Sequence, residues 1–243
     1  MKKIKETLSF IATLFLALIC AGIIRSFWFE PFHIPSGSMK PNLLVGDYII
    51  VSKYSYGYSR FSFPFGYNFE YFKGRVLNKE PQRGDVVVFR YPADTSINYV
   101  KRLIGMPGDT VQMIDGVLYI NDKKIPKDFD SVFFDQQVDF GKSEINIFQE
   151  TLPEGKKIKV LDAFDSSADD TGIFKVPANH YFMMGDNRDN SQDSRFLSAV
   201  GFVHEDNIIG KARFIFLSTS QPIWKFWKYH NSLRFSRIFK KIL

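Results

Sequence analysis

The sequence predicts a mainly β protein with an antiparallel, barrel-like or sandwich-like body and one N-terminal transmembrane helix. Short runs rich in Val, Ile, Tyr and Phe recur after Pro41 and are separated by Gly and Pro. No helical period of useful length occurs between Lys40 and Ser220. The chain has 243 residues, of which 45% are hydrophobic and 24% charged, which excludes a disordered chain and permits one or two cores.

The N-terminal run from Leu8 to Ile24 contains no charged residue and is extended by an aromatic stretch beyond Arg25. At 1.5 Å per residue the run spans about 25 Å, close to the hydrocarbon core of a bilayer once its flanks are added. Three lysines precede it: Lys2, Lys3 and Lys5. The positive-inside rule therefore predicts a cytoplasmic N-terminus and translocation of the remainder. A cleavable signal peptide fits less well, because the run is long and lacks a small-x-small exit.

The β-rich segments of the body come in a clear order. They are Asp47–Tyr54, Asp85–Tyr91, Asn98–Ile104, Thr110–Ile114 and Val117–Asn121. The last two flank Asp115-Gly116, a strong signal for a two-residue hairpin turn. Close spacing of short strands with such turns favours antiparallel pairing and hence a barrel or sandwich.

Aromatic residues alternate between Tyr54 and Phe72. A hairpin of period two would place these rings on one face. That face either packs into the core or lies at the bilayer interface, where Tyr and Trp are favoured.

The net charge of +6 is concentrated at the C-terminus, because residues 221–243 contain six basic residues and no acidic one. The rest of the chain is neutral on balance. A basic, aromatic segment of this kind predicts a membrane-surface tail and argues against nucleic-acid binding.

The segment from Val111 to Val176 is more polar and rich in aspartate. Its aspartates do not follow the spacing of a calcium-binding loop, so solvated loops are the simpler interpretation. The single cysteine excludes an intrachain disulfide and a cysteine-based zinc site. We expect neither a metal nor a cofactor.

Two residues compete as the base for a serine nucleophile. His33 lies close in sequence to Ser36 and Ser38. The other candidate is Lys101, inside the predicted strand Asn98–Ile104. Its amine is a base near neutral pH only if the pKa falls by roughly 2.5 to 3 units. Full burial supplies shifts of about 3 to 5 units, whereas a snorkelling or paired lysine would stay charged.

Four segments resemble, in chain order, the sequence boxes of the bacterial type I signal peptidases (leader peptidases). They are Phe32–Asp47, Arg83–Phe89, Tyr99–Asp109 and Gly185–Arg195. They lie behind an N-terminal anchor and cover about a third of the chain. The chain is therefore similar to a family of membrane-bound serine endopeptidases with a serine-lysine dyad.

The resemblance implies roles for individual residues. Ser38 matches the nucleophile and Lys101 the general base, while Ser36 and the Ser38 N–H match the oxyanion hole. Ser191 matches the serine that orients the lysine. The matching supporting residues are Asp186, Asp193 and Arg195, and the residues that match shallow apolar substrate pockets are Ile34, Met39, Leu43, Tyr99 and Val100.

The resemblance also implies an architecture and a substrate. The expected parts are an anchor (1–29), a catalytic β domain (30–110 and 177–220), an inserted smaller β domain (111–176) and the tail (221–243). The implied activity removes signal peptides from exported preproteins after Ala-x-Ala-like sites through an acyl-enzyme. The expected partners are preprotein signal peptides and the phospholipid bilayer, with proximity to the secretion translocon. The catalytic domain is expected on the periplasmic side of the inner membrane.

Three alternatives remain open at the level of the sequence. One is a specialised relative, such as a pilin-transfer or organelle-type processing peptidase with a narrow clientele. Another is a self-cleaving repressor of the LexA type, although an anchor stands where such a protein needs a DNA-binding helix-turn-helix. The third is a non-catalytic envelope scaffold.

Overall fold

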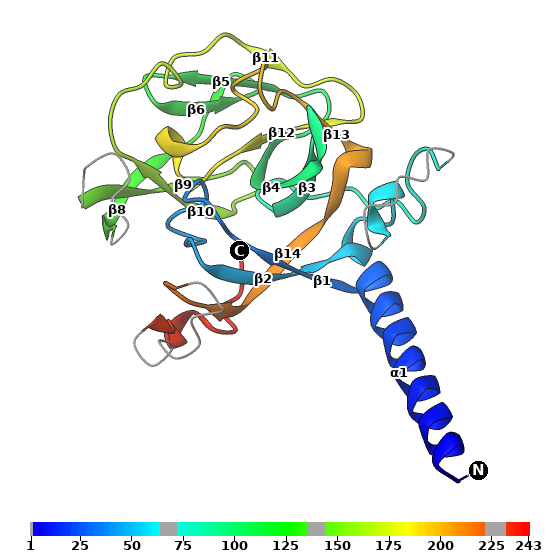
Figure 1. Ribbon diagram of the computed structural model, residues 1–243. Coiled ribbons are helices and arrows are strands. Elements are labelled where there is room, and N and C mark those ends of the chain that lie inside the picture. The colour runs from blue at the N-terminus through cyan, green and yellow to red at the C-terminus, as the bar shows by residue number, and fades with distance from the viewer. Residues whose placement is uncertain (1, 64–71, 136–143, 222–231) are drawn as a thin grey trace.

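The chain folds into antiparallel β-sheets with a long N-terminal helix projecting from the body (Figure 1). The computed structural model describes residues 2–63, 72–135, 144–221 and 232–243. Within these ranges the strands form sheets of seven, four and three strands. The predicted mainly β, antiparallel class is confirmed.

The seven-stranded sheet carries the segments that resemble the peptidase boxes. Its strands, in spatial order, are β1 (Phe29–His33), β2 (Asp47–Ser52), β14 (Ile208–Ser218), β3 (Val86–Tyr91), β4 (Asp94–Gly105), β12 (His180–Met184) and β13 (Val203–His204). Every pairing in it is antiparallel. The central strand β3 is buried from Val86 to Phe89, which explains its unbroken apolar sequence.

The other two sheets are built from the middle of the chain. The four-stranded sheet has the order β11 (Phe174–Lys175), β5 (Thr110–Ile114), β6 (Val117–Ile120) and β7 (Lys123–Lys124). The three-stranded sheet has the order β10 (Lys157–Asp162), β9 (Glu144–Thr151) and β8 (Lys127–Phe134). These strands lie between Thr110 and Lys175, within one residue of the expected insert, whose exact boundaries stay a prediction.

The insert and the large sheet share a hydrophobic core. Ile104 of β4 and Phe182 and Met184 of β12 belong to the same buried cluster as the interior of the two smaller sheets. The members contributed by those sheets include Val111, Met113, Leu118, Ile120, Ile158 and Val160. Packing therefore continues from the large sheet into the insert.

The β5–β6 hairpin forms as its sequence predicts. Asp115 and Gly116 have φ values of 47° and 67°. Positive φ at both central residues is the signature of the type I′ turn, whose twist matches that of the flanking strands. The Asp-Gly pair tolerates this conformation because Gly has no Cβ and Asp is among the residues that adopt it most readily.

The N-terminal helix α1 (Lys2–Phe27) is longer than the uncharged run and continues through Arg25. Its span from Lys3 to Phe27 is long and apolar enough to cross a membrane, and its 18-residue apolar window has a mean hydropathy of 2.5 with no residue buried in the protein. Figure 1 shows α1 extending away from the sheets. An apolar helix without protein cover suits a lipid surrounding.

The segment after β2 differs from the expected aromatic hairpin. Short 3₁₀ helices form at η1 (Lys53–Ser55) and η2 (Arg60–Ser62), and Tyr58 makes only an isolated bridge to Val76. The expected strand pair is therefore wrong where the structure describes it, and residues 64–71 lie outside the described residues. Alternating aromatic residues misled the prediction because Gly57 breaks the strand, with a φ of 78°.

The described part of the tail, residues 232–243, packs back onto the body. Arg237 Nη2 lies 2.6 Å from an oxygen of the buried Asp47, and Arg234 Nη2 lies 3.6 Å from the other. These two positive charges neutralise a carboxylate of the protein itself. Phe235 and Phe239 are 69% and 76% exposed, so contact of this tail with a bilayer stays a prediction.

The other 3₁₀ helices that the structure describes are short connectors. They are η4 (Arg188–Asn190), η5 (Glu205–Asn207) and η7 (Phe235–Arg237).

Candidate active site

The loop between β1 and β2 carries Ser36 and Ser38. Backbone hydrogen bonds close it at its base, from Ile34 N to Asp47 O (2.8 Å) and from Gly46 N to Ile34 O (2.9 Å). Asn187 holds its tip, because its backbone N–H donates to Ser38 O (3.1 Å) and its Nδ2 to Gly37 O (3.2 Å). Hydrogen bonds thus hold the loop that carries the serine hydroxyls at its base and at its tip.

Lys101 reaches this loop from the large sheet. It lies on β4 opposite Val87 of β3, and its Nζ lies 2.6 Å from Ser38 Oγ. Among the described residues this hydroxyl is the hydrogen-bond partner of the amine. His33 lies near Ser38, but its ring packs in a tilted arrangement against Tyr48, with centroids 4.7 Å apart, and makes no hydrogen bond to Ser38 among the described contacts.

The surroundings of Lys101 favour the neutral amine. The residue is 3% exposed. Burial lowers the pKa of Lys101 to about 8, because the charged form loses its hydration, while the nearby charges of Asp193 and Asp186 oppose this effect. An appreciable fraction of the amine is therefore unprotonated near neutral pH and can accept a proton.

Ser36 lies beside Ser38 on the solvent side of the loop. Its Oγ is 3.4 Å from Ser38 Oγ, and the residue is exposed. The assignment of Ser36 and the backbone N–H of Ser38 to an oxyanion hole stays a prediction.

Ser191 is buried near the same loop but makes no hydrogen bond to the lysine in the described structure. Its Oγ has no hydrogen-bond partner among the residues that the structure describes. The expected hydrogen bond to Lys101 is therefore not formed. A Cβ on Gly185 would lie 2.2 Å from Ser191 Oγ and 2.6 Å from Ser38 O, so glycine is needed for Ser191 to pack this closely.

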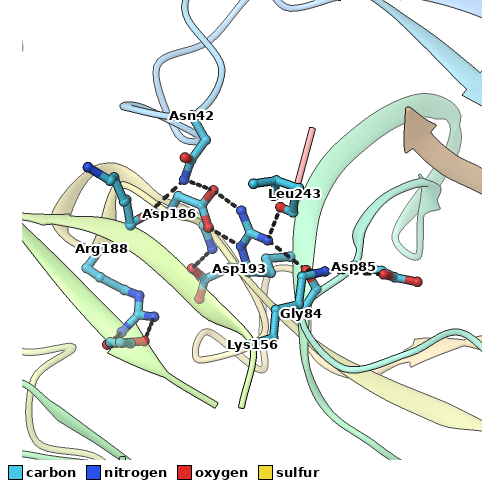
Figure 2. A network of polar contacts seen from close by, with 12 residues as sticks. Asn42, Gly84, Asp85, Lys156, Asp186, Arg188, Asp193 and Leu243 are labelled. Carbon is cyan, nitrogen blue, oxygen red and sulfur yellow. Dashed lines mark hydrogen bonds and ion pairs between the residues drawn. The ribbon is translucent and has the colours of Figure 1, made fainter. Parts of the chain in front are cut away.

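Arg102, the residue after Lys101, is buried and forms an ion network. Figure 2 shows its partners Asn42, Asp186 and Leu243 within this network. The Arg102 Nε and Nη2 lie 2.7 Å and 2.8 Å from the two oxygens of Asp186. Asn42, from the serine loop, donates to Asp186 at 2.7 Å, and Arg102 also donates to the Leu243 oxygen at 2.7 Å. The network ties β4, the serine loop, the Asp186 loop and residue 243 together.

Asp193 and Arg195 form a second buried ion pair close to Lys101. Arg195 Nε lies 2.9 Å from Asp193 Oδ1, and the Gly185 N–H donates to Asp193 Oδ2 at 2.9 Å. Burial by itself would raise the pKa of Asp193, but the charge and hydrogen bonds of Arg195 hold it below its usual range. The expected pairing is present in the structure.

A cleft of about 370 Å³ opens beside Ser38 and Lys101. Four of the expected pocket residues line it: Ile34, Met39, Tyr99 and Val100. Leu43 is not among the lining residues, and its side chain is fully buried in the adjoining core cluster. Sequence reasoning missed other lining residues: Pro35, Ile97, Asn98, Asn190 and Gln192.

The strand β4 has a free edge along this cleft. On one side β3 pairs with it from Asn98 to Arg102, but on the other β12 pairs only from Arg102 to Gly105. Residues 98–101 therefore lack a strand partner on the β12 side within the described chain. An unpaired edge beside an apolar cleft can accept an extended peptide as an added strand.

The comparisons with known proteins all find signal peptidases. The model of the signal peptidase family, peptidase S26, matches residues 7–217. A signal peptidase I from Rickettsia typhi is 45% identical over 94% of this chain and 91% of its own length, and one from Rickettsia prowazekii is 44% identical over the same shares. A crystal structure of a signal peptidase I from Enterococcus faecalis V583 is 29% identical, with a TM-score of 0.32 and coverage of 55% of this chain and 97% of that chain.

Proposed function

Since the chain belongs to the signal peptidase family, peptidase S26, we propose that it is a membrane-anchored serine endopeptidase that removes signal peptides from exported preproteins. Ser38 is the nucleophile and neutral Lys101 the general base. The 2.6 Å contact between Lys101 Nζ and Ser38 Oγ carries this proposal, because it joins a buried amine to a hydroxyl.

The reaction begins when Lys101 takes the proton of Ser38 Oγ as this oxygen attacks the scissile carbonyl carbon. Ser36 Oγ and the Ser38 N–H donate to the oxyanion of the tetrahedral intermediate. The Lys101 ammonium then gives its proton to the leaving amine as the C–N bond breaks, which leaves an ester on Ser38. Lys101 next takes a proton from water, whose oxygen attacks this ester, and Ser38 regains its hydrogen as the acid product departs.

The substrate binds in an extended form along the free edge of β4, with main-chain hydrogen bonds to residues 98–101. Its alternate side chains enter the cleft beside Ile34, Met39, Tyr99 and Val100. Such shallow apolar walls suit alanine-like side chains, so cleavage follows small-x-small sites of the Ala-x-Ala kind.

The topology follows from α1 and its flanking lysines. The N-terminus lies in the cytoplasm and the sheets on the periplasmic side of the inner membrane. There the enzyme meets preproteins close to the translocon, with the bilayer as a second partner.

The test uses the full chain, purified in lipid vesicles, and a preprotein whose signal ends in Ala-x-Ala. The protein is expected to cut after this site, and Ser38→Ala or Lys101→Met is expected to abolish the cut. Lys175→Met, at an exposed lysine of β11, is the matched control. Undiminished cleavage by either site variant, or no cleavage by the wild type, would reject the proposal.

A further inference from the structure

The anchor helix runs into the sheet almost without a connection. Helix α1 ends at Phe27 and β1 begins at Phe29, and the intervening Trp28 N–H still donates to Ile24 O at 2.9 Å. Strand β1 then leads directly into the loop of Ser38. The orientation of α1 relative to the cleft is therefore decided at this junction.

One carboxylate braces the junction. Glu30 of β1 accepts through Oε1 from Arg25 of the last helical turn, with Nη2 at 2.7 Å and Nε at 3.0 Å. Its Oε2 lies 2.8 Å from Lys53 Nζ. The Lys53 side chain is fully buried and donates also to Ser62 O at 2.6 Å. Glu30 thus links the helix to a cation buried in the body.

Backbone and aromatic contacts support the same junction. The Lys53 N–H donates to Trp28 O at 3.0 Å, and the Tyr58 hydroxyl donates to Phe27 O at 2.8 Å. The rings of Phe27 and Tyr58 meet edge to face at 5.5 Å. Because contacts on several sides fix the end of α1, a free hinge between anchor and body is absent from this described part of the chain.

We infer that Glu30 is a positioning residue that fixes the height of Ser38 above the bilayer and thereby determines which peptide bond of a membrane-inserted preprotein is cut. The inference rests on the proposed function. A signal peptide holds its apolar segment in the membrane, so the number of residues between that segment and the scissile bond sets the height of the bond. Each added residue raises an extended chain by about 3.3 Å. If the cleft is held rigidly relative to α1, it reaches scissile bonds at one height above the membrane. If the junction is flexible, it reaches scissile bonds at several heights.

The experiment compares preproteins that differ only in the spacing between apolar segment and cleavage site. The full chain in vesicles is assayed on the parent preprotein and on one with four inserted residues, which lengthen an extended segment by about 13 Å. The wild type is expected to cut the lengthened preprotein at least about tenfold more slowly, since misplacement of a reacting bond by even 1 Å carries a large penalty.

The variant Glu30→Gln/Lys53→Met removes the brace without leaving an unpaired buried charge. It is expected to lose most of this discrimination and to cut both preproteins at similar rates. On a short soluble peptide, whose position no membrane restrains, its kcat/KM should equal that of the wild type. A purely structural defect would instead lower all three activities together.

Glu144→Gln makes the same change at an exposed glutamate of β9 and should keep the wild-type discrimination. If the double variant folds and discriminates as the wild type does, the inference is wrong. If it unfolds, Arg25→Gln tests the same brace from the helix side, where Arg25 is 51% exposed in its side chain. Full discrimination in that variant would also overturn the inference. Failure of the wild type to cut any preprotein would refute the proposed function instead.

Discussion

Buried lysines lie in two different kinds of surroundings in this protein. Lys40, two residues after Ser38, has its Nζ at 2.7 Å and 3.0 Å from the oxygens of the buried Asp135. Lys53 is paired with Glu30 at 2.8 Å. Lys101 is equally buried, but its hydrogen-bond partner in the described structure is the uncharged hydroxyl of Ser38. Burial is common to the three, and the nature of the partner separates them.

The comparison teaches how a buried amine can be kept available as a base. The carboxylates whose charges raise the pKa of Lys101 are Asp193 and Asp186. Asp193 is paired with Arg195, and Asp186 is paired with Arg102. Desolvation therefore dominates and lowers the pKa of Lys101 to about 8. A carboxylate in direct contact would favour the ammonium form.

Replacing the two kinds of lysine should give opposite phenotypes. Lys101→Met is expected to lower kcat/KM on a signal peptide by more than about 10⁴-fold, as loss of a base that works as a unit with its nucleophile does. Lys40→Met leaves Asp135 buried without this cation and should cost about 3–5 kcal/mol in the free energy of unfolding. Steady-state kinetics and urea unfolding measure the two effects. Equal loss of activity at equal stability in both variants would erase the distinction.

The pH profile should follow the neutral form of Lys101. With a pKa of about 8, kcat/KM should rise by about tenfold per pH unit below this value and level off above it, because the deprotonated amine is the active form. The measurement is kcat/KM on a soluble peptide at constant ionic strength. A flat profile between pH 6 and 8 would contradict the role given to desolvation.

Removing Arg195 should make Lys101 resemble the paired lysines. Arg195 lowers the pKa of Lys101, whereas Asp193 raises it, so Arg195→Gln exposes the amine to the uncompensated charge of Asp193. We expect an alkaline shift of about one unit and about tenfold less activity at pH 7, with recovery at higher pH. Arg213→Gln is the control, because Arg213 of β14 donates to Ser52 and Ser55 and is not among the charges that shift the pKa of Lys101. An unshifted profile in a folded Arg195→Gln protein would argue against this coupling.

A further prediction concerns the free energy of unfolding. The pKa of Lys101 is about 8 in the folded protein against an ordinary value of 10.5, so the folded state binds fewer protons than the unfolded state between these values. The resulting destabilisation is fully present below pH 8 and disappears as the pH rises towards 10.5. Lys101→Met should therefore stabilise the protein by up to about 3 kcal/mol at pH 7 and by less at pH 10. Unfolding at both pH values tests this, and a gain independent of pH would contradict it.

The sequence predicted the strands because their signals are local, and the resemblance of short segments singled out Ser38 and Lys101, which the structure brings to 2.6 Å of each other. The β3 and β4 runs, the Asp115-Gly116 turn and the serine and lysine segments each depend on a few neighbouring residues. Asp135, by contrast, belongs to the aspartate-rich segment for which the sequence favours solvated loops, yet it is buried against Lys40. Sequence separation of 95 residues hides such a pairing, since no local pattern distinguishes a paired aspartate from a hydrated one.

The contacts that individual side chains make in the site could also not be predicted from the sequence. The box resemblance placed Leu43 in a pocket and Ser191 on the lysine, yet Leu43 is in the core and Ser191 Oγ lacks a partner in the described chain. Such assignments depend on the rotamer and on fractions of an ångström in backbone position, which motif spacing does not encode.

The hydrophobic cluster common to the large sheet and the insert has a consequence for how the protein denatures and how it can be engineered. Excising residues 110–175 would leave Ile104, Phe182 and Met184 facing water, although each is now fully buried. Those residues lie on β4 and β12, the two strands whose mismatch in length creates the vacant edge beside Lys101. We therefore expect that the insert cannot be removed without unfolding the rest of the protein, and that the two parts unfold in a single cooperative transition. Short deletions should be tolerated at exposed turns such as the one at Gly155, whereas deletion of the whole insert should not.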